Sequence, residues 1–126
     1  MSVKHVIAKY FSKHAETSED HWDSGLQTHY YKTTKDKGLQ ALETFFNQSD
    51  IYQVNSISEQ HGEISVNVIK GRKAFIIATI IMVRPYRTAI DFTVTTESIL
   101  PSDFAYSSKL IRRLYHEFDK IFTLID

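Results

Sequence analysis

The sequence contains no cysteine, and its 126 residues include only two prolines and four glycines. Without cysteine the chain cannot form disulfides, thiolate nucleophiles, zinc ribbons or iron–sulfur clusters. It also lacks the glycine-rich phosphate loop, the dinucleotide fingerprint and the G-x-S-x-G elbow of serine hydrolases. We therefore name no catalytic residue and expect no cofactor, and an enzyme is the less favoured interpretation.

The sequence also lacks a net charge and a long apolar run. Fifteen basic and fifteen acidic side chains cancel, so no overall field attracts nucleic acid or an anionic membrane. The longest apolar run, residues 74–83, is half of the about 20 residues that a membrane-spanning helix needs. Residues 1–5 lack the apolar core of a signal peptide. We predict a cytoplasmic protein without membrane contact.

The overall amino-acid composition is that of a folded domain. Hydrophobic residues make up 42% of the chain and charged residues 24%, which is close to the globular average. A length of 126 residues fits one domain. We predict a single α+β domain over residues 1–126.

Hydrophobic periodicity separates the chain into helices and strands. Apolar residues at helical spacing predict helices over residues 3–11, 35–46 and 104–125. Alternation predicts strands over 26–32, 51–57, 64–68, 73–83 and 90–95, with Gly62 in one turn and Gly71-Arg72 as a two-residue hairpin. Short turns join the last four strands, which favours an antiparallel meander within a five-stranded sheet, with helices packed on it.

The predicted order of elements is α-β-α-β-β-β-β-α. After the first helix, this order resembles that of a half-domain of the TATA-binding protein. The resemblance implies a topology and no function.

One predicted strand differs from its neighbours because residues 74–83 are apolar on both faces. In an antiparallel sheet this pattern is typical of a central strand whose two faces are both covered. Either the helix predicted at 3–11 or a second copy of the protein can provide the second cover. We predict a protein that acts through protein–protein contact, as a homodimer.

Basic residues gather at both ends of this strand. Arg72 and Lys73 precede it, and Arg84, Tyr86 and Arg87 follow it. Basic side chains beside an aromatic ring can bind phosphates and stack on a base. The alternative function is therefore an anionic-ligand or nucleic-acid module, which binding to a labelled oligonucleotide at low salt would support and no binding would eliminate.

A small-molecule pocket is a further alternative. Six tyrosines can either line a cavity or fill a core, and filling a core is the commoner role. They are Tyr30, Tyr31, Tyr52, Tyr86, Tyr106 and Tyr115. The acidic segment 19–23 contains His21, but consecutive loop residues point in different directions, so we predict no metal site. We expect Trp22 to anchor this loop in the core.

The segment 102–111 resembles a signature, S-D-x-G-x-N-x-x-x-I, of a family of small bacterial proteins of unknown function. Ser102, Asp103 and Ile111 match it, whereas Ala105 and Ser107 replace the Gly and Asn. The resemblance implies no known activity and singles out Ser102 and Asp103, both of which are also helix-capping residue types.

Overall fold

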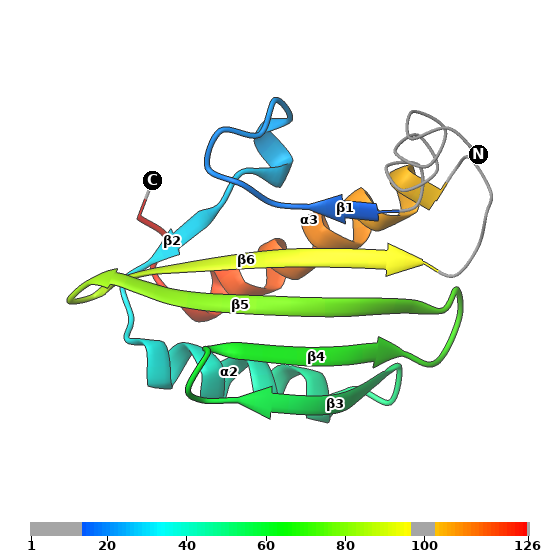
Figure 1. The fold of residues 1–126 in the computed structure, drawn as a ribbon, viewed down its shortest axis with the longest axis horizontal. Coiled ribbons are helices and arrows are strands. Elements are labelled where there is room, and N and C mark those ends of the chain that lie inside the picture. The colour runs from blue at the N-terminus through cyan, green and yellow to red at the C-terminus, as the bar shows by residue number, and fades with distance from the viewer. Residues whose placement is uncertain (1–13, 97–102, 126) are drawn as a thin grey trace.

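A computed structural model describes residues 14–96 and 103–125 (Figure 1). In these residues one six-stranded sheet carries two helices on one face, so the α+β class is confirmed. The helix predicted at 3–11 lies outside the described residues. The elements are β1 (His14–Glu16), the short 3-10 helix η1 (Ser24–Leu26), β2 (His29–Tyr31), α2 (Lys35–Gln48), β3 (Tyr52–Ser58), β4 (Glu63–Val68), β5 (Ala74–Arg84), β6 (Arg87–Thr96) and α3 (Asp103–Ile121).

The sheet has the strand order β1-β6-β5-β4-β3, and β2 also pairs with β6. Every pair of strands is antiparallel, and β3 to β6 form the predicted meander. The sheet has six strands where five were predicted, because β1 adds one. Its three residues are too few for alternation to be recognised. β1 and β2 lie one after the other along the outer edge of β6, and residues 17–28 leave this edge as a loop.

A side-chain cap defines the start of α2, and pairing with an edge strand defines the end of α3. The Thr34 hydroxyl accepts a hydrogen bond from the Lys37 N–H and caps the start of α2. α3 ends at Ile121, four residues before the predicted end. The chain then runs beside β2, where the Ile125 N–H donates to the Tyr30 carbonyl at 2.7 Å. Pairing with this edge strand replaces the last helical turn.

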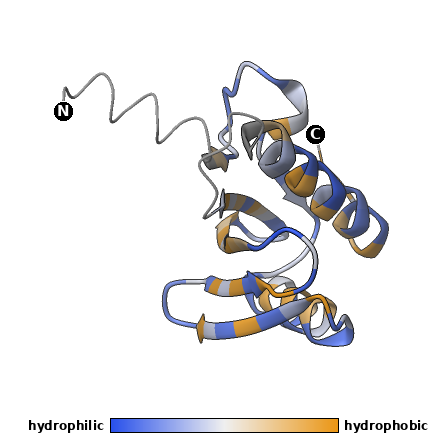
Figure 2. Ribbon diagram, turned by 90° about the vertical axis from the view of Figure 1, so that its right-hand side faces the viewer, coloured by the Kyte–Doolittle hydropathy of each residue, from blue (hydrophilic) through white to orange (hydrophobic). Residues whose placement is uncertain are grey.

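The core lies between the sheet and the two helices. Alternate residues of each strand face the helices and the others face away, which Figure 2 shows as bands of opposite hydropathy along the strands. The Phe118 ring of α3 lies 5.1 Å from Phe45 of α2 and 6.0 Å from Phe92 of β6. This ring therefore joins both helices to the sheet.

The two turns that flank β4 differ from one another. Gly62 has φ +64°, and its carbonyl accepts a 2.7 Å hydrogen bond from the Ile80 N–H. A Cβ at Gly62 would lie 2.4 Å from the Ile80 carbonyl oxygen, so close packing and the positive φ each favour glycine at this position. The connection from β4 to β5 spans residues 69–73, so the predicted two-residue hairpin is wrong.

Candidate functional site

The face of the sheet opposite α2 and α3 carries no described element (Figure 1). The register places Phe75, Ile77 and Ile81 of β5 on this open face. Phe75 and Ile81 are exposed, and Ile77 is partly exposed, in the structure of residues 14–96 and 103–125. The second cover that the doubly apolar strand predicts is therefore not supplied by the described part of the chain.

Neutral polar side chains flank the apolar residues of the open face. Ser56 and Ser65 share a 2.7 Å hydrogen bond between their hydroxyl groups, and the Asn67 amide donates to Asn55 at 2.9 Å. These pairs lie on β3 and β4, where they satisfy one another. Polar groups that already pair with one another cost less to remove from water than unpaired ones. This part of the open face is therefore suited to contact with another surface, whereas Glu63 and Asp91, opposite Thr79, place carboxylates further along the same face.

Exposed apolar side chains are concentrated on β5 and on the turn after it. Among the described residues ten large apolar side chains are exposed, and five belong to this segment, with exposed fractions between 37% and 58%. We call these five the β5 patch: Phe75, Ile81, Met82, Val83 and Tyr86. Such a concentration is typical of an interaction surface, whereas single exposed apolar residues are ordinary.

The end of β5 projects beyond β4. The pairing of β4 with β5 stops at Thr79, and Figure 1 shows the hairpin of β5 and β6 extending past that point. We call residues 81–87 the β5–β6 arm. Val83 is the extra residue of a bulge between Met82 and Arg84. A bulge increases the local twist and disfavours pairing with a further strand, so any contact of the arm with another surface would involve its side chains.

Tyr86 stands at the tip of the arm with φ +58°. A left-handed conformation costs a residue with a side chain roughly 1–2 kcal/mol, and glycine is the usual occupant. The Tyr86 side chain is more than half exposed and gains no core burial in return. Strain at an exposed aromatic residue motivates the hypothesis that this ring makes a contact outside its own chain.

The predicted basic residues do not meet in one site. Arg72 and Lys73 lie in the loop before β5, and Arg84, Tyr86 and Arg87 lie at its other end. The eleven residues of β5 separate the two groups by roughly 36 Å, at 3.3 Å per residue.

Two of these basic side chains have aromatic partners within the chain. The Arg72 guanidinium lies 4.8 Å from the centroid of the Tyr106 ring, whose hydroxyl donates to the Arg72 carbonyl. Arg87 lies 4.4 Å from the Tyr30 ring in the same manner. A base that stacked on either ring would compete with this cation–π contact. Anion or nucleic-acid binding stays a prediction, and the separation of the two groups does not favour it.

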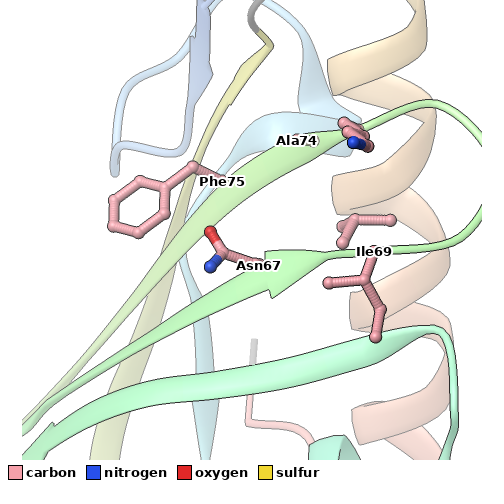
Figure 3. A pocket seen from close by; sticks show the side chains of 6 residues that line it. Asn67, Ile69, Ala74 and Phe75 are labelled. Carbon is pink, nitrogen blue, oxygen red and sulfur yellow. The ribbon is translucent and has the colours of Figure 1, made fainter.

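A hollow of about 280 Å³ lies where β4 and β5 separate, beside the first basic group. Figure 3 shows Phe75 and Asn67 on one side of these strands and Ile69 on the other. The lining residues therefore do not converge on a single ligand-sized centre. Of the six tyrosines considered as pocket residues, Tyr31, Tyr52 and Tyr115 are buried in the core.

A polar cluster that the sequence did not indicate joins β2 to α3. The Asp119 carboxylate accepts hydrogen bonds from the Tyr31 hydroxyl at 2.6 Å and from His29 Nδ1 at 2.9 Å. Burial, with the nearby carboxylate, raises the pKa of the Tyr31 phenol far above its ordinary value. The His29 ring stacks on Tyr115 with centroids 3.7 Å apart. Tyr31 and His29 lie 88 and 90 positions from Asp119 in the sequence, so no local motif predicts the cluster. Their mutual contacts indicate a structural link.

Asp91 lies on the open-face side of β6, opposite Thr79. Its carboxylate accepts hydrogen bonds of 2.6 Å from the hydroxyl groups of both Thr17 and Thr28. Thr17 also accepts a hydrogen bond from the Phe92 N–H. Asp91 therefore closes the two ends of the loop that interrupts the edge strand, which is a structural role.

The loop between β1 and β2 is held differently from the prediction. Trp22 is 81% exposed, so its expected role as an anchor in the core is wrong. The loop is instead fixed by the buried Leu26 and by an ion pair between Asp23 and Arg112 of α3. A short loop can anchor itself through an aliphatic residue and a charge, which leaves the larger ring in solvent. Within the described residues no group of three potential metal ligands occurs.

The signature residues are only partly described. Ser102 lies outside the described residues, and Asp103 is the first residue of α3.

Among the described helices none has the length and apolar character needed to cross a membrane. No protein-family model matches the chain, and no curated protein or solved structure shows significant similarity to it. The arrangement of the site is therefore the basis for a functional assignment.

Proposed function

We propose that this protein is a non-enzymatic protein-contact module that forms a homodimer through the β5 patch. The observation that supports the proposal is that half of the exposed large apolar side chains among the described residues lie on one strand and its turn. The cytoplasmic location and the lack of a cofactor remain predictions from the sequence.

The size of the surface supports a contribution from the arm as well as from the flat open face. Strands about 4.8 Å apart, with about 3.4 Å per residue, give the open face over β3 to β6 an area of roughly 500 Å². A standard interface buries about 800 Å² per partner. The flat face alone is a small contact surface, and the exposed side chains of Met82, Val83 and Tyr86 extend it.

Two matched substitutions test the proposal. Ile81 in the patch is 52% exposed, and Ile121 at the end of α3 is 49% exposed. Ile81→Gln removes apolar area from the proposed interface, and Ile121→Gln removes a similar area elsewhere. Sedimentation velocity over a range of concentrations should show a dimer that Ile81→Gln weakens and Ile121→Gln leaves intact. A wild-type monomer at all concentrations, or equal effects of the two substitutions, would contradict the proposal.

A further inference from the structure

The β5–β6 arm exposes apolar side chains on both of its faces. Alternation directs Ile81 to the open face and Met82 to the opposite face, and both are exposed. The helices that cover the second face further along β5 do not shield Met82 at this end. A flat partner surface covers one face of such an arm, whereas a groove encloses both.

A groove with suitable chemistry lies between α2 and the end of β3. It has a volume of about 430 Å³. The described residues that line it are Asp36, Leu39, Gln40, Glu43, Ile57 and Glu59. Ile57 is partly exposed there and offers an apolar contact, while three carboxylates surround it. We call this the acidic groove.

The charges of the arm and of the acidic groove are complementary. Residues 79–90 include Arg84 and Arg87 and no acidic side chain. The lining of the groove has three carboxylates and no basic side chain, although Lys35 nearby donates to the Gln60 carbonyl. The chain as a whole is neutral, so this attraction arises from how the charges are distributed.

The arm and the groove lie at the same end of the molecule. The arm begins after Ile80, whose N–H donates to Gly62 in the turn that follows β3. Glu59 of the groove belongs to that turn. A two-fold axis at this end allows each arm to enter the groove of the other copy, so every contact occurs twice.

We infer that the β5–β6 arm of one copy inserts into the acidic groove of a second copy, with Arg84 beside Glu59 and with Tyr86 and Met82 against Leu39 and Ile57. This inference rests on the proposed function and specifies the partner surface of the β5 patch. The contact also gives the strained, exposed Tyr86 ring a site of burial.

Charge reversal tests the inference directly. Arg84→Glu and Glu59→Lys should each weaken dimerisation about tenfold or more, because each places two like-charged pairs in the dimer. The double variant Arg84→Glu/Glu59→Lys restores opposite charges and should recover most of the affinity. Lys109→Glu, on the exposed side of α3, is the control charge reversal. Dissociation constants come from sedimentation equilibrium, and circular dichroism checks that each variant is folded.

The outcomes separate the inference from the proposal on which it rests. Weakening by each single substitution and recovery in the double variant support the inference. A dimer that resists both single substitutions but is lost in Phe75→Lys packs through the open face, which overturns the inference and keeps the proposed function. A wild-type monomer at every concentration refutes the proposed function itself.

Discussion

Gly62 in the β3–β4 turn packs closely against Ile80, next to the start of the β5–β6 arm. Alanine substitutions at Gly62 and Gly71 measure how much this close packing contributes to stability. At Gly62 a Cβ would lie 2.4 Å from the Ile80 carbonyl oxygen, whereas at Gly71 a Cβ would meet nothing within 4 Å. Both glycines have positive φ, at +64° and +78°. Gly71→Ala therefore reports the conformational cost alone, and Gly62→Ala reports that cost together with the clash.

The expected magnitudes follow from these contacts. The left-handed conformation costs an alanine roughly 1–2 kcal/mol at either position. At Gly62, overpacking against a backbone atom adds about 1–3 kcal/mol. Weakening of the 2.7 Å Ile80 N–H bond adds about 1 kcal/mol. We expect Gly62→Ala to lower the free energy of unfolding by about 2 kcal/mol or more beyond Gly71→Ala.

Urea unfolding followed by circular dichroism gives both values by linear extrapolation. The slope of the free energy against urea concentration should be the same in both variants, because the surface exposed on unfolding is unchanged. Equal losses of stability in the two variants would refute the packing of the β3–β4 turn against β5. A loss at Gly71 larger than at Gly62 would refute it more strongly.

Three further results are expected. Thr88→Val should cost about 1–3 kcal/mol in urea unfolding, because the buried Thr88 hydroxyl donates to the Thr33 carbonyl at 2.6 Å, and an unchanged stability would exclude this bond. Burial raises the pKa of the Tyr31 and Tyr115 phenols. Their contribution to stability is therefore complete below the unfolded pKa of about 10 and is lost as the pH rises above it. Tyr115→Phe should reduce this alkaline loss of stability in pH-dependent unfolding, and an unaltered pH profile would contradict the raised pKa of Tyr115. Removal of residues 1–13 should leave the mass in solution unchanged if a second copy covers the open face, whereas new self-association would show that this segment covers it.

The deletion ends at residue 13 because Ala15 is buried and β1 pairs with β6. Removing β1 as well would expose the edge of β6 and mix two effects. The boundary of a clean deletion is thus defined by a strand that sequence periodicity did not reveal.

Periodicity predicted the elements that bury a regular stripe. In α3, residues such as Leu110, Leu114 and Phe118 repeat at helical spacing and are all buried, which made the helix recognisable. The four-strand meander was equally accessible, because its strands alternate and short turns join them. β1 and the extended segment after α3 were missed, since three or four residues paired at an edge leave no periodic signal.

The candidate site was predictable only in part. The apolar character of β5 on both faces singled out this strand, and the described structure leaves one of those faces uncovered. Long-range contacts, such as that of Asp119 with Tyr31, depend on how elements 88 residues apart pack together. The acidic groove likewise combines α2 with the end of β3, which lie together only after folding.

The central claim, that the β5 patch is the surface through which two copies meet, can be tested residue by residue with nuclear magnetic resonance. Amide signals are recorded while the protein is diluted from a concentration that favours the dimer. We predict concentration-dependent shifts in residues 75–87, with the signals of exposed residues at the end of α3 unchanged. Shifts confined to other surfaces, or none at any concentration, would contradict the claim.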